Sequence, residues 1–417
     1  MNKTPFSKLT VLDFSRYLPG GYATQPLADW GANVIKVEDT GLGDFSRHDY
    51  PTKHGVSYYI TALGRNKKSI SLDLKNKEVV SLFLKMAAKA DVIVESFRPG
   101  VTKKLGIDYA SIKAINPRII YVSISGYGQN DPRSLKAQHD LNMQAQSGYL
   151  SVNHGSTSPL HLCDLSSGMV AGQAILSALY AREETGEGAY IDISMYDCLV
   201  WWNSLLDSRY CFNDGVCKRE DLEYPSTCYN VYETKDGGHL ALGMVEMKFW
   251  KPFCEAIGAP ELIDAHLHRR WEVPEAFEKM EGIIKGKTVA EWEQWLADKD
   301  FCIATVLSKD EAIKQITMEN PETLRYVNFP DVGKVLQTNI PHHISTMPVS
   351  IDDFVQPSRL GQDTAEELKK VGCDDVKIAE LGEKGSILLD SPVDPNFVDD
   401  NPVAPDPKSG FVRRAAC

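Results

Sequence analysis

The sequence lacks the cysteine pattern of a structural metal site or of a disulfide framework. Its nine cysteines are scattered, odd in number and never spaced as C-x-x-C. Such spacing is typical of reduced thiols. We therefore expect no metal and, because the N-terminal MNKTPFSKLTVLDF has no apolar core for a signal peptide, a cytoplasmic protein.

Long apolar runs and an excess of basic charge are also absent. No stretch approaches the roughly 20 apolar residues of a membrane span. The 417 residues carry 45 Lys and Arg against 57 Asp and Glu, for a net charge of -12. Because nucleic-acid affinity comes from clustered cations that neutralise phosphates, this balance argues against a general nucleic-acid binder. We expect neither a membrane nor a nucleic-acid partner.

The sequence has no dinucleotide-binding fingerprint. The first turn, Leu18–Thr24 (LPGGYAT), lacks the G-x-G-x-x-G spacing that admits a pyrophosphate, and no Walker A motif is present. Glu38, at the end of the next predicted strand, is only weak evidence for a ribose contact. These absences disfavour an NAD-dependent oxidoreductase.

The first 200 residues alternate between β-rich and helical runs. Near-continuous Val and Ile runs between helical patterns predict a parallel sheet covered on both faces, an α/β doubly wound fold. The predicted strands are Leu9–Phe14, Asn33–Glu38, Ser69–Leu74, Asp91–Ser96, Arg118–Ser125 and Ala189–Ser194, with a turn at Pro19–Gly21 and helices at Tyr22–Trp30, Lys77–Ala90 and Met169–Arg182.

The chain is long enough for two domains, since a single core stops growing at about 250–300 residues. Residues 1–224 are predicted as the large domain and 225–320 as a smaller α/β domain. The remaining residues, 321–417, include an acidic, proline-rich tail from 390 to 408 that cannot build its own core. The smaller domain is predicted to contain a hairpin of Tyr229–Glu233 and Gly238–Gly243 and helices at Lys248–Ile257, Pro274–Ile284 and Thr288–Asp298.

A basic cluster, Arg65–Lys68 (RNKK), precedes a predicted strand. Two interpretations are equally open. The cluster can hold the phosphates of an anionic cofactor through charge-assisted hydrogen bonds, or it can be the solvated start of an element.

Two short motifs carry candidate reactive groups. His139 opens the run His139–Asn142 (HDLN), and Asp164 follows 25 residues later at the threshold of a helix rich in small residues. A carboxylate beside a helix N-terminus can act as a base or nucleophile. The structural alternatives are a helix-capping role for Asp164 and a hydrogen-bonding role for His139.

Together these stretches resemble CoA-transferase family III, the CaiB/BaiF family, and most closely its α-methylacyl-CoA racemase branch. The resemblance runs from about residue 8 to residue 310 and is specific as a set. The matching segments, in family order, are Gly31–Glu38, Gly43–Arg47, Arg65–Lys67, Leu72–Lys75, Phe97–Val101, Ser125–Gly128, His139–Asn142, Asp164, Thr185–Gly188 and Gly243–Glu246.

The resemblance implies a Rossmann-like large domain to which the C-terminal segment returns, a small α/β domain, and a homodimer of two interlocked chains. It also implies coenzyme A as part of an acyl-CoA substrate, with no permanently bound cofactor. At Asp39 the chain departs from the family, which usually has an arginine there that reaches a CoA phosphate. The implied CoA-binding residues are Leu72, Asp73, Leu74, Lys75, Ser96, Phe97, Arg98, Lys104, Gln138, Asp140, Leu141, Asn142 and Met143.

The resemblance implies one of two reactions. In the racemases, the residues matching His139 and Asp164 exchange the α-proton of a 2-methylacyl-CoA. In the transferases, the aspartate matching Asp164 attacks an acyl-CoA to give an anhydride and then an aspartyl-CoA thioester. The His139 motif, Glu246 in a Gly-x-x-Glu run, and the lack of a glycine-rich loop between 225 and 260 favour the racemase branch.

In the racemase mechanism, Glu246 is expected to orient the imidazole of His139. Backbone N–H groups at the start of the helix that carries Asp164 are expected to stabilise the enolate. Transfer of CoA is the alternative activity. A non-catalytic acyl-CoA carrier, which needs neither His139 nor Asp164, is a third possibility.

Overall fold

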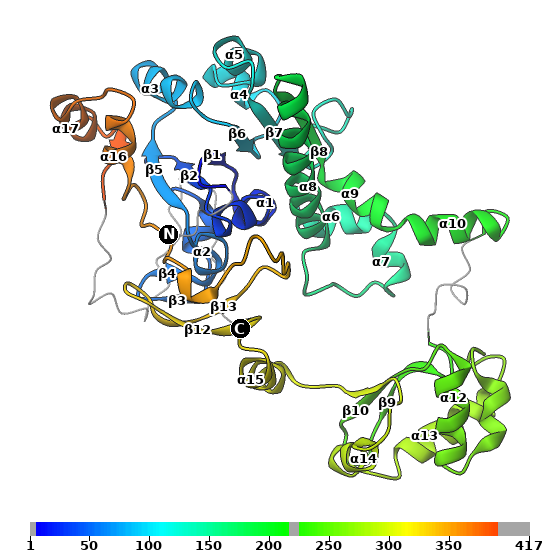
Figure 1. Cartoon of the computed structure of the whole chain (residues 1–417). Helices are drawn as coiled ribbons and strands as arrows, with labels where there is room; N and C mark the ends of the chain where they lie inside the picture. The colour runs from blue at the N-terminus through cyan, green and yellow to red at the C-terminus, as the bar shows by residue number, and fades with distance from the viewer. Residues whose placement is uncertain (1–5, 217–224, 391–417) are drawn as a thin grey trace. The chain divides into compact units, whose positions relative to one another are not determined.

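The computed structural model describes residues 6–216 and 225–390 (Figure 1). The chain divides into two compact units, one formed by Met1–Leu205 with Glu319–Cys417 and the other by Leu206–Met318. The predicted acidic tail after residue 390 and part of the loop before residue 226 lie outside the described residues.

The first unit is built on a seven-stranded sheet in which six strands are parallel. In space the order is β14-β5-β2-β1-β6-β7-β8, and the short β14 runs antiparallel to β5 at one edge. The predicted parallel strands are confirmed, two with the same bounds and the others within two residues. The strands are β1 (Thr10–Phe14), β2 (Asn33–Glu38), β5 (Lys68–Leu72), β6 (Val92–Glu95), β7 (Ile120–Ser125), β8 (Ala189–Ser194) and β14 (Ile387–Leu388).

The strand order reverses direction between β1 and β6. From β1 the chain winds outward through β2 to β5, and it then returns to β6 on the other side of β1. In open α/β sheets such a reversal leaves a crevice at the carboxyl ends of the two central strands, where ligands bind. The topology therefore places a candidate site next to Phe14 and Glu95.

Helices cover both faces of this sheet, as the sequence predicts. On β1, Val11 packs into the core with α1 (Tyr17–Asp29) and α8 (Leu162–Thr185), whereas Leu12 packs into the core with α3 (Lys77–Ala87). Successive side chains of a strand point to opposite faces, so each strand contributes to both cores. The result is a mixed α/β fold with a mainly parallel central sheet.

Helix α1 begins earlier than predicted and contains the predicted turn Pro19–Gly21. Proline is tolerated here because it lies in the first helical turn. Gly20 is required by a close approach, since a Cβ atom there would lie 2.0 Å from the Cβ of Ser15. The predicted turn is therefore wrong, and the glycines serve helix packing.

Helix α8 also begins earlier than predicted, at Leu162, and it packs along α1. A Cβ atom on Gly168 would lie 2.7 Å from the carbonyl oxygen of Pro19, so glycine permits this close approach. In the part of the chain that the structure describes, α8 is the one helix long and apolar enough to cross a membrane, contrary to the sequence expectation. Its Ala171 and Ile175 are fully buried in the core with α1, whereas its Met169 and Tyr180 are exposed.

The second unit, Leu206–Met318, has its own antiparallel sheet and core. The predicted hairpin is confirmed as β9 (Tyr229–Glu233) and β10 (His239–Gly243), with β11 (Ile303–Thr305) added on the other side of β10. The predicted helices are confirmed as α12, α13 and α14, and they enclose the fully buried Trp250 and Trp292. Their bounds are Met247–Ala256, Pro274–Ile284 and Val289–Leu296.

The remaining elements are short. They are β3 (Thr52–Lys53), β4 (Val56–Ser57), α2 (Tyr58–Leu63), α4 (Val101–Leu105), α5 (Tyr109–Ile115), α6 (Asp140–Gln146), α7 (Tyr149–Val152), α9 (Met195–Trp202), α10 (Ser204–Phe212), α15 (Lys309–Glu319), β12 (Leu324–Phe329), β13 (Gly333–Thr338), α16 (Thr364–Lys369) and α17 (Asp375–Glu383), with single 3-10 turns at Phe45–His48, Pro260–Ala265 and Ile351–Asp353.

Candidate active site

A cavity of about 690 Å³ opens where the strand order reverses. The residues at and after the carboxyl ends of β1, β2, β5 and β6 line it, and α4 contributes two apolar side chains. Ligands of doubly wound sheets bind at this edge. Five of the residues predicted to contact CoA lie together in its wall: Leu72, Asp73, Leu74, Lys75 and Phe97.

Arg16, which the sequence analysis did not single out, also lines this crevice. Its guanidinium lies 3.0 Å from the carboxylate of Asp39 and 5.7 Å from the centre of the Phe97 ring. The backbone N–H of Arg16 donates to the hydroxyl of Ser96 at 2.8 Å. Ser96, a predicted CoA contact, therefore holds the turn that presents Arg16. A cation directly after the first strand was the signal that could have identified it.

Buried ion pairs form the floor of the crevice. Glu38 accepts two hydrogen bonds from Arg47, both 2.6 Å, and is therefore not available to a ribose. Lys36 pairs with Asp44 at 2.7 Å. Although burial opposes ionisation of Asp13, the neighbouring Lys36 and Lys67 and the hydroxyls of Ser15 and Thr24 lower its pKa to about 2. These charges are satisfied within the protein and fix the strand ends.

The basic cluster Arg65–Lys68 also belongs to this internal network. Arg65 is buried and pairs with Asp29 at 2.7 Å. Lys67 is buried and donates to the carbonyl of Gly21 at 3.0 Å, while Lys68 pairs with Glu367 at 2.5 Å. Both interpretations of the cluster, a phosphate site and a solvated element start, are wrong for Arg65 and Lys67.

The other predicted phosphate contacts, Arg98 and Lys104, are exposed in the segment after β6. Lys104 lies on α4, whose Val101 and Leu105 line the crevice. Arg98 and Lys104 do not themselves line the crevice. Their predicted contacts with the CoA phosphates stay a prediction.

Asp164 lies in the first turn of α8 and is half-buried. A buried carboxylate from α6, Asp140, accepts the backbone N–H of Cys163 at 2.7 Å and that of Asp164 at 3.4 Å. Asp140 thus caps α8 from another helix, and the interpretation of Asp164 as the capping residue is wrong. The carboxylate of Asp164 makes no hydrogen bond or ion pair within the described ranges.

Burial, and then the negative charge of Asp140, raises the pKa of Asp164 from 3.8 to about 7. A carboxyl group with such a pKa exists in both protonation states near neutral pH. It can therefore accept or return a proton, which is the requirement for general acid–base catalysis.

His139 and His161 differ in their surroundings. His139 is exposed, and its backbone N–H donates to the side-chain oxygen of Asn142 at 3.2 Å. No hydrogen bond or ion pair joins His139 to Asp164, both of which the structure describes. The imidazole grouped with Asp164 is that of His161, which lies 3.8 Å from Asp140, and the ligand atoms of these three residues lie within 4.8 Å of one another.

His161 was not among the site residues predicted from the sequence. His161 and Asp164 are three residues apart at the start of a helix, so both lie on one face of it. This spacing is the sequence feature that could have identified His161. A His and two carboxylates can also hold a cation, but both oxygens of Asp140 already accept hydrogen bonds, from Cys163 and from Gln144. The arrangement is better suited to proton chemistry.

The expected enolate stabilisation needs correction. The N–H groups of Cys163 and Asp164, at the start of α8, are the donors that Asp140 already engages. In the described part of the chain, the N–H of Leu162 is the first-turn donor that has no partner. It is the backbone group at this helix start that remains for an oxyanion.

The predicted contacts on α6 divide into exposed and buried groups. Gln138, just before the helix, has a buried side-chain oxygen with no hydrogen-bond partner among the described residues. Leu141 and Asn142 are exposed. Met143 is fully buried with Cys163, so its side chain serves packing.

Two tyrosines, Tyr17 at the start of α1 and Tyr59 on α2, pack against each other. Burial, and then the negative charge of Asp164, raises the pKa of Tyr59 on α2. The ring of Tyr59 is 6.0 Å from that of Tyr17, which directly follows Arg16.

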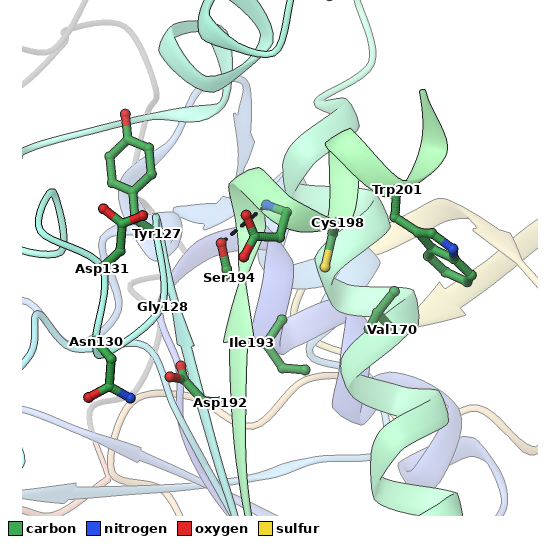
Figure 2. Close-up of a pocket in the computed structure, with 11 residues that line it drawn as sticks. Tyr127, Gly128, Asn130, Asp131, Val170, Asp192, Ile193, Ser194, Cys198 and Trp201 are labelled. Atoms are coloured by element: carbon green, nitrogen blue, oxygen red, sulfur yellow. Dashed lines mark hydrogen bonds between the residues drawn. The ribbon is translucent and has the colours of Figure 1, made fainter. Parts of the chain in front are cut away.

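A second cavity, of about 490 Å³, lies between β8, α8 and α9 (Figure 2). Val170 and Trp201 lie on one side, and Asp131 and Asp192 lie on the other (Figure 2). No lysine or arginine lines it. Because phosphates need cations, this cavity suits CoA less well than the crevice does.

Glu246 lies in the second unit, exposed, immediately before α12. Its backbone carbonyl accepts the N–H of Phe249 at 3.0 Å. Its expected action on the imidazole of His139 stays a prediction.

Comparison with known proteins identifies the family of this arrangement. The profile of CoA-transferase family III matches residues 6–364. Acetyl-CoA:oxalate CoA-transferase of Acetobacter aceti is 37% identical over 62% of this chain and 68% of its own, and human alpha-methylacyl-CoA racemase is 30% identical over 73% and 78%. A crystal structure of a CAIB/BAIF family protein from Brucella suis matches with a TM-score of 0.77 and 25% identity, covering 88% of this chain and 100% of that chain.

Proposed function

The chain belongs to CoA-transferase family III, and we propose that it exchanges the α-proton of 2-methylacyl-CoA thioesters, with His139 and Asp164 as the two bases. The observation that carries the proposal is the state of Asp164. It is half-buried, it has no hydrogen-bonding or ionic partner for its carboxylate among the described residues, and its pKa is about 7.

Inversion at the α-carbon needs one group on each face of that carbon. His139 as a neutral imidazole takes the proton, the C–H electron pair moves onto the thioester oxygen, and protonated Asp164 returns a proton from the other side. The reverse reaction exchanges the two protonation states. Because the carbon must lie between the bases, the lack of a direct bond between His139 and Asp164 fits this mechanism.

The remainder of the substrate occupies the crevice in this proposal. The nucleotide of CoA lies against Leu72–Lys75 and Phe97, and the thioester passes Gln138. The unpartnered side-chain oxygen of Gln138 supports a ligand contact there, since buried polar atoms are normally hydrogen-bonded. The acyl-CoA is the substrate, and no permanently bound cofactor is part of the proposal.

We also propose a homodimer with interlocked chains. The support on the first unit is an apolar surface at its end, where Trp201, Trp202 and Leu205 are 61%, 45% and 80% exposed. Contiguous exposed apolar side chains of this kind mark interaction surfaces. A cytoplasmic location fits the seven cysteines in the described part of the chain, all of which are free thiols.

Transfer of CoA between carboxylic acids is the second candidate, favoured by the higher identity to the oxalate transferase than to the racemase. Here the Asp164 carboxylate attacks the thioester carbonyl, the C–S bond breaks and CoA leaves as a thiolate. The thiolate then attacks the aspartyl carbonyl of the anhydride, which releases the acyl group as a carboxylate. An incoming acid takes the CoA through a second anhydride.

The test is proton NMR of the purified protein with one enantiomer of a 2-methylacyl-CoA in heavy water. We expect the α-proton signal to disappear with epimerisation, and no free acid to be needed. A second spectrum follows addition of a carboxylic acid. No exchange before the addition, followed by a new CoA thioester after it, would replace the racemase proposal with the transferase.

A further inference from the structure

We propose that Asp39 weakens the binding of CoA by competing with its phosphates for Arg16. The inference rests on the proposed function, since it takes CoA as the ligand of the crevice. It assigns an affinity-setting role to an ion pair at the mouth of that crevice. The pair consists of Arg16, two residues after the end of β1, and Asp39, directly after β2.

Arg16 is held at the crevice by contacts that do not depend on Asp39. Its guanidinium lies 4.8 Å from the centre of the Phe45 ring and 5.7 Å from that of Phe97. A guanidinium stacks well on aromatic faces, and it binds carboxylates and phosphates through the same planar set of donors. Removal of Asp39 should therefore leave the cation in place and free its donors.

Asp39 is likewise held in place. One carboxylate oxygen accepts the backbone N–H of Gly41 at 2.9 Å and that of Gly43 at 3.3 Å. The other oxygen accepts from Arg16 at 3.0 Å. An asparagine can keep the two backbone contacts through its carbonyl oxygen while losing the negative charge.

The other charges of the crevice do not relieve this competition. Two further acidic residues of its lining, Glu38 and Asp44, are neutralised by buried ion-pair partners. The charged residues of the lining that remain are two cations, Arg16 and Lys75, and two anions, Asp39 and Asp73. The groups that remain for a ligand therefore sum to no net charge, although the ligand is a polyanion. Loss of one carboxylate gives the crevice a net positive charge.

The ion pair is exposed enough to be exchanged. The side chains of Arg16 and Asp39 are 35% and 43% exposed, and such pairs contribute little because water screens them. A phosphate carries more charge than a carboxylate and can displace it from the guanidinium. The cost of this displacement is what lowers the affinity for CoA.

Calorimetric titration with CoA tests the inference on Asp39→Asn, Arg16→Gln and the double variant. We expect Asp39→Asn to lower the Kd by about three- to tenfold and Arg16→Gln to raise it by a similar factor. In the double variant, the gain in CoA affinity caused by Asp39→Asn should be largely lost. In the Asp39→Asn single variant, the gain in CoA affinity should become smaller at high salt, because salt screens the charges. Glu183→Gln, in an exposed pair with Arg118, is the matched control and should leave the Kd unchanged.

The two possible failures are separable. If the wild-type protein does not bind CoA, the proposed function fails. If the wild-type protein binds CoA and Asp39→Asn leaves its Kd unchanged or higher, the competition by Asp39 is refuted while the proposed function stands. The competition by Asp39 would also be refuted if Asp39→Asn increased the affinity for CoA equally in the wild-type and Arg16→Gln backgrounds.

Discussion

Replacement of Asp164 by asparagine should reduce turnover by about 10³-fold or more and at the same time stabilise the folded protein. The loss of activity follows from the loss of a group that accepts, returns or shares a proton or electron pair with the substrate. An amide can do none of these near neutral pH. Both candidate reactions predict this loss, because both act through the Asp164 carboxyl.

The gain in stability follows from the pKa of Asp164, which burial and Asp140 raise to about 7. The folded state binds this proton more tightly than the unfolded state, so ionisation destabilises the fold. The free energy of unfolding of the wild type therefore falls as the pH rises from about 4 to about 7. Above that range the variant should be more stable by about 1–2 kcal/mol, and the difference should vanish below about pH 4.

Asp197→Asn is the matched control for this variant. Asp197 is also in the first turn of its helix, α9, but it is exposed. It should show near-normal turnover and no gain in stability above pH 7. Thermal unfolding over a pH series measures the stabilities, and initial rates measure the turnover. An active Asp164→Asn enzyme would remove Asp164 from the mechanism.

Replacement of His139 by alanine should affect the two enantiomers of the substrate unequally. With one base removed, loss of the α-proton from the enantiomer that His139 deprotonates should fall by about 10²- to 10⁴-fold. The other enantiomer should still exchange its proton through Asp164, without full inversion. Deuterium incorporation into each separate enantiomer measures this difference.

His161→Ala provides the decisive comparison, because His161 is the histidine that the structure groups with Asp140 and Asp164. The account predicts that this variant loses activity equally toward both enantiomers. If His161→Ala instead shows the unequal loss and His139→Ala does not, the base opposite Asp164 is wrongly assigned. A mild, equal loss in His139→Ala would favour the transferase.

The strands of the sheet could be predicted from the sequence because each strand is marked by a short run of its own residues. Val- and Ile-rich runs between helical patterns gave β2 and β8 their observed bounds. The predicted turn at Pro19–Gly21 is part of α1, where Gly20 permits the close approach to Ser15. Gly168 of α8 in turn permits the close approach to the carbonyl oxygen of Pro19. Composition alone does not distinguish a turn glycine from a packing glycine.

The candidate site could be predicted where a residue's position after a strand determines its place in the site. It could not be predicted where a charged residue pairs with another residue that is distant in sequence. Leu72–Lys75 and Phe97 come together because they lie at or just after the carboxyl ends of β5 and β6, parallel strands of one sheet whose carboxyl ends share an edge. The basic residues Arg65 and Lys67 pair with groups that are distant in sequence, and the partner of Arg65 is Asp29. The capping of α8 by Asp140 is likewise a contact between separate helices.

The titration of Asp164 itself shows whether this carboxyl group can both accept and return a proton near neutral pH. Carbon NMR of protein labelled at the aspartate carboxyl carbons can follow it, with Asp164→Asn identifying its signal by subtraction. The account predicts a midpoint near 7, and a lower midpoint in Asp140→Asn because a neighbouring negative charge is removed. A midpoint near 4 in the wild type would contradict the account, because Asp164 would then be fully ionised at neutral pH and could not return a proton.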